Sequence, residues 1–225
     1  MIDTIVISDI HLGSSVSNRE KVLEVLDMSF NTLIINGDLF DNHSFHRYTK
    51  KDWKILTRIR KLSKTHRVIL VKGNHDGCAE FLAAITGMEF TKSYSFIVNE
   101  RRMLCEHGDE YDHWIQSKPV ITFIFTGLYY FIQKLDKKNV ITRRLKAWSK
   151  SWVRAKDIVS ERFLAKRGQD YDVIMAGHTH YPEEKCDVIH KCHYINSGSF
   201  CDEVCTFIKI YSDGSTKLTY LYDFI

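Results

Sequence analysis

The sequence predicts an α/β fold with a large antiparallel component. Short apolar runs rich in valine and isoleucine recur along the chain, and each of them ends in polar residues. Between the first three runs lie segments with apolar residues at three- and four-residue spacing, which is typical of amphipathic helices. From residue 94 onward the runs follow one another as they do in hairpins. Alternating strands and helices followed by hairpins indicate a central sheet that is covered on both faces.

The first half of the chain supplies the strand–helix alternation. We expect strands at Ile2–Ser8, Thr32–Asn36 and Arg67–Val71, and helices at Arg19–Ser29 and Asp52–Ser63. The three strands are almost wholly apolar, as strands are when helices or a second sheet cover both of their faces.

The second half of the chain supplies the antiparallel component. Hairpin-like strands are expected at Tyr94–Asn99, Arg101–Cys105, His193–Ile195, Val204–Tyr211 and Lys217–Tyr222. Tyr171–Ala176 is a further short apolar run that is expected to be a strand. Asp213 and Gly214 stand between the last two hairpin-like strands, and an Asp-Gly pair between apolar runs is a strong hairpin signal.

Residues 114–167 interrupt this rhythm. The run VITFIFTGLYYFIQ at 120–133 is mostly apolar, but its 14 residues fall short of the ~20 that a membrane-spanning helix needs. The next stretch, 134–167, holds 12 Lys or Arg residues against three Asp or Glu, a local net charge of +9. We therefore expect a single domain over 1–225 with a helical insertion at about 114–167. The insertion is either a lid over a substrate or a helical hairpin that packs on the body.

The composition is that of a soluble globular domain. Of the 225 residues, 44% are hydrophobic and 27% are charged, which argues against disorder and fits one domain with a sizeable core. The N-terminus lacks a basic stretch followed by an apolar one, so we expect a cytoplasmic protein with reduced cysteines. Four cysteines could bind zinc, although their spacing is irregular: Cys186, Cys192, Cys201 and Cys205. The uneven charge suggests that the insertion meets an anionic partner.

Acidic, amide and imidazole side chains follow five of the expected strands. Each motif alone is a weak signal, since the first could be a helix cap and the second a turn. Five such motifs in order, each at the end of an expected strand, make coincidence a poor explanation. They are Asp9 and His11 in SDIHLG, Asp38 and Asp41 in NGDLFD, Asn74, His75 and Asp76 in KGNHDG, His107 and Asp109 in CEHGDEYD, and His178 and His180 in AGHTH.

These side chains are expected to meet at one edge of the sheet. Loops at the carboxyl ends of strands in an open α/β sheet converge on one crevice. Residues two apart at a strand end point the same way, so His178 and His180 can present two ligands to one place. Histidines, carboxylates and an amide without thiolates suit manganese, iron or zinc in a catalytic role. Seven ligands divide naturally between two ions that share a carboxylate, and such a pair can activate a hydroxide that attacks a phosphoryl centre.

The five motifs, in this order and with none missing, resemble the signature of calcineurin-like metallophosphoesterases. The resemblance spans residues 1–113 and 170–200. It implies a four-layer α/β/β/α metallophosphoesterase sandwich. It also implies two divalent metal ions, most readily manganese, with hydrolysis of a phosphodiester or pyrophosphate bond by a hydroxide that bridges them.

The same resemblance implies a role for each site residue. Asp9, His11 and His180 would hold one metal, Asn74, His107 and His178 would hold the other, and Asp38 would bridge the two. His75 would contact the phosphate and protonate the leaving oxygen, oriented by Asp76. Histidine suits this role because its charge changes near neutral pH.

The insertion and the motifs GDLFD, HGDEYD, GHTHYP and YINSGSF are similar to those of bacterial UDP-2,3-diacylglucosamine pyrophosphohydrolases. This similarity implies a nucleotide-linked substrate. The segment 120–167 would then accept acyl chains or contact the inner face of a membrane, and its basic residues would attract phosphates or anionic lipid. The chain departs from that group at His75, where the group has arginine.

Other functions stay open at this stage. A nuclease or nucleic-acid phosphodiesterase would use the basic insertion for phosphate contacts, with Trp148 and Trp152 stacking on bases. A scaffold would keep the fold and lose catalysis, which the intact ligand residues oppose. The insertion could also join two copies of the chain into a homodimer.

Overall fold

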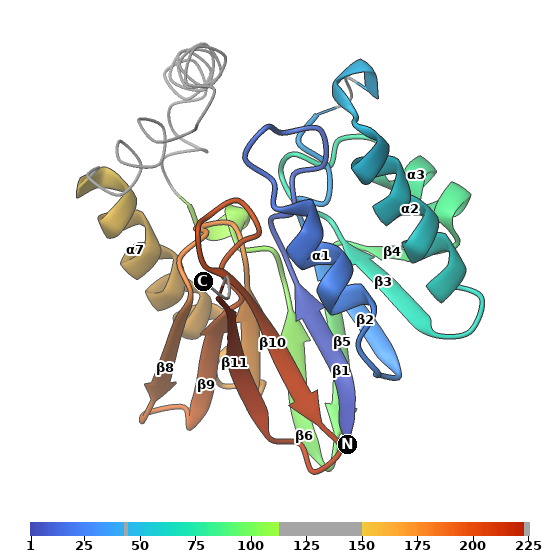
Figure 1. Cartoon of the computed structure of the whole chain (residues 1–225). Coiled ribbons are helices and arrows are strands. Elements are labelled where there is room, and N and C mark those ends of the chain that lie inside the picture. The colour runs from blue at the N-terminus through green and yellow to red at the C-terminus, as the bar shows by residue number, and fades with distance from the viewer. Residues whose placement is uncertain (43–44, 113–149, 223–225) are drawn as a thin grey trace.

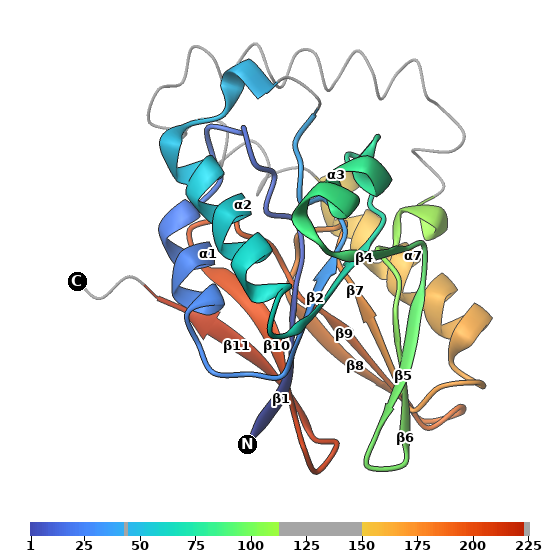
Figure 2. The ribbon, with the colours of Figure 1, turned by 90° about the vertical axis from the view of Figure 1, so that its right-hand side faces the viewer.

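The computed structural model describes residues 1–42, 45–112 and 150–222 of the chain. Two sheets pack face to face, with three helices on the outer face of one and a fourth helix on the outer face of the other (Figures 1 and 2). This arrangement is the predicted four-layer α/β/β/α sandwich. Among the described residues, no helix is both long enough and apolar enough to cross a membrane.

The first sheet contains the strand–helix alternation of the N-terminal half. Its order is β11-β10-β1-β2-β3-β4, with β1 to β4 parallel to one another, β10 antiparallel to β1, and β11 antiparallel to β10. The strands are β1 (Ile2–Ile7), β2 (Thr32–Asn36), β3 (Arg67–Val71), β4 (Glu89–Thr91), β10 (Cys205–Tyr211) and β11 (Thr216–Leu221). Five of these six were predicted, and the three-residue β4 was not, because it has too few residues to show an alternating pattern.

Three helices cover the outer face of this sheet: α1 (Arg19–Leu26), α2 (Lys50–Leu62) and α3 (Ala79–Thr86). Helix α2 begins two residues before the predicted start at Asp52. The reason is a capping box, in which Thr49 is the N-cap and the carboxylate of Asp52, at the third helical position, accepts a hydrogen bond from the Thr49 backbone N–H. Helix α3 was not predicted, and Gly87 in the left-handed conformation ends it.

The second sheet has the order β5-β6-β7-β9-β8. Its strands are β5 (Tyr94–Val98), β6 (Arg101–Cys105), β7 (Val173–Ala176), β8 (Glu183–Asp187) and β9 (Cys192–Asn196). The prediction missed β8, an edge strand of sequence EEKCD that has no apolar run. Between the two sheets lies a core of buried aliphatic side chains to which Val6, Ile34, Met103 and Ile195 belong.

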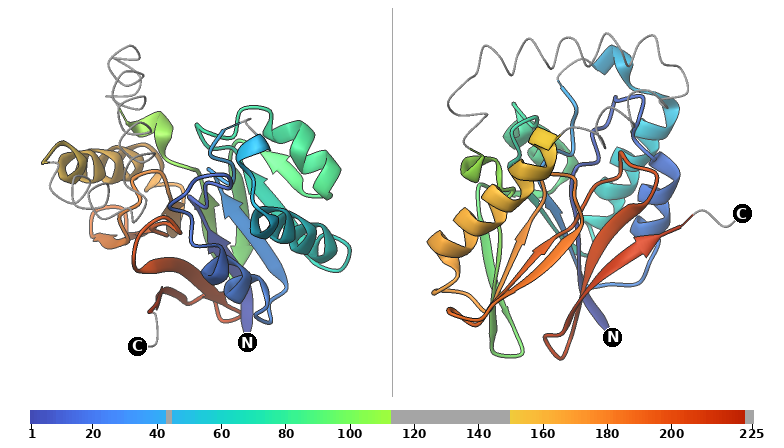
Figure 3. Two further views of the ribbon diagram at one scale, coloured as in Figure 1. Left: turned by 45° about the horizontal axis from the view of Figure 1, so that its top comes forward. Right: turned by 90° about the vertical axis from the view of Figure 1, so that its left-hand side faces the viewer.

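Helix α7 (Lys150–Arg167) covers the outer face of the second sheet (Figure 3). Val159 and Phe163 are fully buried, and the Phe163 ring stacks on Tyr111 with the centroids 4.6 Å apart. Tyr111 belongs to the short 3-10 turn η2 (Asp109–Tyr111), which follows β6. This final part of the predicted insertion is therefore a packed helix of the fourth layer.

The basic side chains of α7 contact the body of the protein. Lys156 lies 3.7 Å from Glu183, Lys166 lies 4.0 Å from Glu110, and Arg167 lies 2.9 Å from Glu106. These three basic side chains thus have acidic partners within the chain, and the expectation of an anionic partner for the insertion stays a prediction. The apolar run 120–133 and the rest of 113–149 lie outside the described residues, so the lid and the single-domain boundary stay predictions.

Candidate metal centre

The loops that follow β1, β2, β3, β6 and β7 meet at one edge of the two sheets (Figure 1). Backbone hydrogen bonds join them: Asp9 N donates to Gly37 O over 3.1 Å, and Gly177 N donates to His107 O over 2.9 Å. The structure brings the seven predicted metal ligands to this edge. Six lie in a network of contacts with Asp9 and Asp38, and Asn74 joins it through His178.

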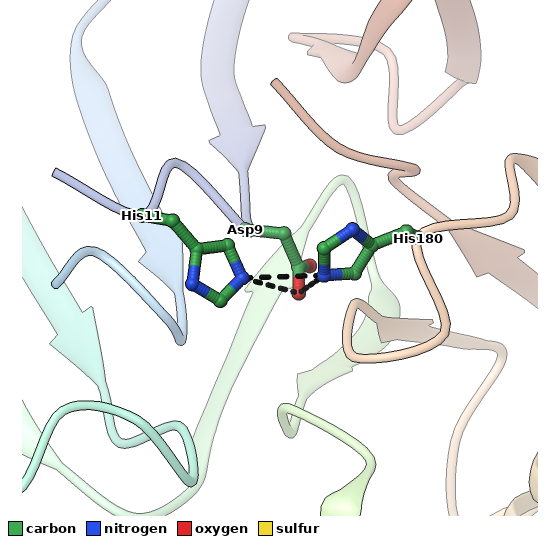
Figure 4. Close-up of side chains that lie close together, drawn as sticks. All are labelled: Asp9, His11 and His180. Carbon is green, nitrogen blue, oxygen red and sulfur yellow. Dashed lines mark hydrogen bonds and ion pairs between the residues drawn. The ribbon is translucent and has the colours of Figure 1, made fainter. Parts of the chain in front are cut away.

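Asp9, His11 and His180 form one compact group (Figure 4). His180 Nε2 lies 3.1 Å from Asp9 Oδ1 and 3.2 Å from His11 Nε2. His11 Nε2 lies 3.9 Å from the same Asp9 oxygen. Three atoms that can each donate a lone pair thus point toward one place, as ligands of a single ion do.

The Asp9 carboxylate is held in a fixed orientation. Its Oδ2 atom accepts hydrogen bonds from the Ser8 hydroxyl and from the backbone N–H of His178, the latter at 3.0 Å. Its Oδ1 atom is buried and has no hydrogen-bond partner among the described residues. Burial alone would raise the pKa of Asp9, but the adjacent His180 lowers it to about 2. Asp9 therefore presents one charged oxygen to the group.

Asp38 lies between two sets of histidines. Its Oδ1 atom accepts the backbone N–H of His75 at 2.9 Å. Its Oδ2 atom lies 3.3 Å from His107 Nε2 and 3.7 Å from His11 Nε2. Burial would raise the pKa of Asp38, yet the neighbouring histidines, His107 first, hold it well below its usual range. One carboxylate oxygen shared by two histidine sets is what a bridging ligand requires.

The His107 ring is oriented as a metal ligand requires. Its Nδ1 atom lies 2.8 Å from the carbonyl oxygen of Asn36 and donates its proton there. The opposite nitrogen, Nε2, faces Asp38 and is buried without a hydrogen bond of good geometry in the described part of the chain. A side chain at Gly37 would come within 2.2 Å of His107 Nδ1, so the glycine of the GD motif makes room for this ring.

His178 and Asn74 face each other on the far side of His107. His178 Nδ1 lies 3.1 Å from Asn74 Oδ1, and its other nitrogen, Nε2, lies 3.0 Å from Asp112 Oδ2. The rings of His107 and His178 meet edge to face with centroids 5.4 Å apart. The sequence did not point to Asp112, although it ends the HGDEYD motif five residues after His107.

His75 also lies at this edge, but Asp76 does not orient it. The Asp76 carboxylate accepts three backbone N–H bonds, from Asp38, Phe40 and Gly73, so it ties the loops after β2 and β3 together. The His75 ring instead donates from Nδ1 to the carbonyl oxygen of Asp41 at 3.0 Å. The expectation for Asp76 was wrong because its side chain points toward the loop backbones, away from the imidazole.

The charge state of His75 follows from its neighbours. Burial would lower its pKa, but the Asp38 carboxylate and the hydrogen bond to Asp41 raise it above 6.5. The ring lies edge-on to His11 with centroids 4.9 Å apart. No described residue hydrogen-bonds its Nε2 atom. His75 is therefore a candidate proton donor at the rim of the ligand cluster.

The residues present fit a pair of divalent cations. Asp9 Oδ1 and His107 Nε2 are buried ligand atoms without hydrogen bonds in the described ranges, and burying such atoms costs free energy unless something binds them. The structure places three ligand groups in the described residues, and Asp9–His11–His180 matches one half of the expected division. Asp9–Asp38–His107 joins ligands expected on different metals, and His11–Asp41–His75 is the third group. None of these three groups includes a cysteine. The oxygen and nitrogen donors suit manganese, iron or zinc.

Backbone strain is concentrated at the same residues. Five of the eight non-glycine residues with positive φ in the described chain belong to the ligand set: Asp9, His11, Asp38, His178 and His180. Their φ values run from 49° to 64°, in the left-handed region where a Cβ atom crowds the next carbonyl. Such strain is typical of functional sites, where the surrounding structure imposes it.

This strain predicts an unusual order of stabilities. Without metal, His180→Gly should have a free energy of unfolding about 1 kcal/mol higher than His180→Ala, because glycine adopts φ 57° without the steric cost. The matched control is exposed Lys54 inside α2, where the order should be reversed, with Lys54→Ala more stable than Lys54→Gly. Urea unfolding of the four variants measures both differences. The same order at both positions would contradict strain at His180.

Metal binding should also release a proton. Burial disfavours a charge on His107, but the Asp38 carboxylate raises its pKa well above 6.5, so near neutral pH the metal-free ring is protonated. A cation needs the lone pair on Nε2, so the proton must leave. We expect the apparent metal affinity to rise with pH until the pKa of His107 is passed. Calorimetry in buffers of different ionisation enthalpy counts the protons; no release near neutral pH would contradict this ligand assignment.

Comparisons with known proteins agree with the fold and with the strand-end motifs. The family model described as calcineurin-like phosphoesterase matches residues 2–182. A search of curated proteins gives no significant match.

Solved structures share the fold at low identity. A hypothetical protein of Pyrococcus horikoshii superposes with a TM-score of 0.54 at 9% identity, over 99% of this chain and 88% of that one. A Thermotoga maritima protein solved by NMR gives 0.51 at 16% identity, over 99% of both chains. Vps29 of Entamoeba histolytica, in a structure with zinc, gives 0.47 at 15% identity, over 97% of both chains.

Proposed function

The chain belongs to the calcineurin-like phosphoesterase family, and from that premise we propose that it is a metal-dependent phosphohydrolase that cleaves a phosphodiester or pyrophosphate bond with two divalent cations. The observation that carries this proposal is the position of Asp38 Oδ2, 3.3 Å from His107 Nε2 and 3.7 Å from His11 Nε2. A buried carboxylate oxygen shared by two imidazole groups has little structural use, but it suits two cations that share one ligand.

The ligands divide between the two cations as the strand ends present them. Asp9, His11 and His180 would hold the first, and Asn74, His107 and His178 would hold the second, with Asp38 common to both. When bound, the cations supply Lewis acidity that neutralises phosphoryl oxygens and lowers the pKa of water, most readily as manganese. The hydrogen bonds to Asp9 Oδ2 and His107 Nδ1 orient these ligands before any cation arrives.

His75 would act on the leaving group. The Asp41 carbonyl holds its Nδ1–H and so fixes the ring. The Asp38 carboxylate and the hydrogen bond to Asp41 raise the pKa of His75, which favours the form that carries a proton on Nε2. As the bond between phosphorus and the leaving oxygen breaks, that oxygen takes the proton from Nε2 and departs as an alcohol or a phosphate monoester. The neutral imidazole then regains a proton from solvent.

The proposed substrate is UDP-2,3-diacylglucosamine or a related nucleotide-linked compound, handled in the cytoplasm or at the inner face of the membrane. Support comes from the motifs GDLFD, HGDEYD, GHTHYP and YINSGSF and from the length of the segment between β6 and β7. The rival reading as a nuclease loses part of its basis, because Lys156, Lys166 and Arg167 of α7 pair with acidic residues of the body.

A substrate panel with manganese tests this proposal. We expect hydrolysis of a bis-aryl phosphodiester, and faster hydrolysis of UDP-2,3-diacylglucosamine than of dinucleoside polyphosphates, cyclic nucleotides or single-stranded DNA. Preference for DNA, with activity that falls steeply as salt rises, would favour the nuclease. No hydrolysis of any member with manganese, iron or zinc would contradict the enzyme assignment and leave a scaffold.

A further inference from the structure

Asp112 is a buried carboxylate beside the site to which no role has been assigned. The residue is 9% exposed, and its Oδ2 atom lies 3.0 Å from His178 Nε2. The other ring nitrogen, Nδ1, lies 3.1 Å from Asn74 Oδ1. His178 is thus held between a carboxylate on one side and an amide oxygen on the other.

The two contacts of His178, with Asp112 and with Asn74, differ in their chemistry. A carboxylate only accepts hydrogen bonds, so the Asp112 contact places the ring proton on Nε2. In the neutral imidazole, Nδ1 then carries a lone pair that faces the lone pairs of Asn74 Oδ1. Two acceptors 3.1 Å apart repel each other unless a cation lies within reach of both. The ring orientation therefore serves a cation more naturally than a hydrogen bond between His178 and Asn74.

We propose that Asp112 is the positioning residue of the second cation site: it fixes the tautomer and orientation of His178, so that Nδ1 and Asn74 Oδ1 together bind the ion. This inference rests on the proposed function, since it takes the two-cation site as given. A carboxylate that accepts the outer N–H of a ligating histidine also makes the ligand nitrogen more basic.

The fourth layer of the fold holds Asp112 in place. Asp112 follows η2, and its backbone N–H donates to Asp109 O over 3.2 Å. Tyr111, the preceding residue, stacks on Phe163 of α7, and Arg162 donates to its carbonyl oxygen at 3.2 Å. Helix α7 thus braces the turn that carries Asp112, which links the end of the insertion to the metal centre.

Glu106 strengthens the same connection. Its carboxylate accepts a hydrogen bond from the Tyr111 hydroxyl and forms an ion pair with Arg167 at 2.9 Å. Glu106 directly precedes His107 in the sequence. Both ends of the segment from His107 to Asp112 are therefore anchored, so two residues that serve the second cation, one as ligand and one as support, share one braced turn.

The test measures cation binding to the purified full-length chain rather than activity alone. Asp112→Ala should lower the affinity for the second manganese ion by about a hundredfold. Asp112→Asn should lower it by about tenfold, because asparagine still accepts the Nε2–H but carries no charge. The first ion, held by Asp9, His11 and His180, should keep its affinity. Glu110→Gln, an exposed position in the same turn, is the matched control and should bind both ions as the unmodified protein does.

The outcomes separate this inference from the proposed function. If the unmodified chain binds two ions, and both Asp112 variants bind the second ion as tightly as the unmodified chain does, the role of Asp112 is overturned while the proposed function stands. If the unmodified chain binds fewer than two ions, the proposed function and this inference both fail. If Asp112 and His178 formed a purely structural ion pair, the Asp112 variants would have a lower melting temperature but no selective loss of the second ion. If the alanine variant does not fold, the near-isosteric asparagine variant decides alone.

Discussion

Asp38→Asn should lower turnover by roughly a thousandfold and weaken the binding of both cations. Asparagine has nearly the same shape, tolerates φ 52°, and can still accept the His75 backbone N–H, so the loops should keep their conformation. What disappears is the negative charge between His11 and His107. Several kcal/mol of transition-state stabilisation depend on the pair of cations, and about 4 kcal/mol corresponds to a factor of a thousand in rate.

The measurement pairs steady-state kinetics on a bis-aryl phosphodiester with the metal content of the dialysed protein. Asp27→Asn is the control, since Asp27 lies at the exposed end of α1 and pairs only with Arg58, at 2.8 Å, among the contacts the structure describes. It should leave turnover and metal content unchanged. If Asp38→Asn kept near-normal turnover with a full complement of metal, Asp38 would not be the shared ligand.

His75→Asn should lower turnover by between a hundredfold and ten-thousandfold, the usual contribution of a general acid, while metal content stays unchanged. The loss should depend on the leaving group. A leaving oxygen of low pKa departs without a proton. The substitution should therefore slow the hydrolysis of a nitrophenyl ester less than the hydrolysis of an alkyl ester. His75 meets the cluster through its backbone N–H to Asp38 and its ring edge on His11, and it is not expected to be a ligand.

His190→Asn serves as the matched control, because His190 lies in the β8–β9 hairpin, where it pairs with Asp187. It should change neither turnover nor metal content. Loss of metal in the His75 variant would reassign this residue to the ligands, as the geometric group His11–Asp41–His75 would permit. An equal loss for aryl and alkyl esters would remove the proton-donor role.

The strand-end motifs could be placed from sequence because their positions depend on local geometry. Parallel strands bring their carboxyl ends to one edge, so a residue such as Asp9 or His107 at the end of an apolar run can be placed there from sequence. The expected seven ligands lie at that edge. Their roles on bound metal stay predictions, since distances among side chains do not establish an ion.

The supporting contacts could not be predicted in the same way. Asp76 binds the backbone of loops that are adjacent only after folding, and the carbonyl oxygen that orients His75 belongs to Asp41, whose backbone carries no sequence signal. Asp112 reaches His178 across 66 residues of sequence. Strand β8 has a polar sequence, as edge strands do, since among the described residues only β9 pairs with it.

The most direct test of the central claim is a manganese titration of the metal-free protein, with cation binding and phosphodiester hydrolysis measured on the same samples. The position of Asp38 between His11 and His107 predicts two ions per chain, with hydrolysis appearing as the second ion binds. One ion per chain with full activity, or no binding and no hydrolysis with manganese, iron or zinc, would contradict it.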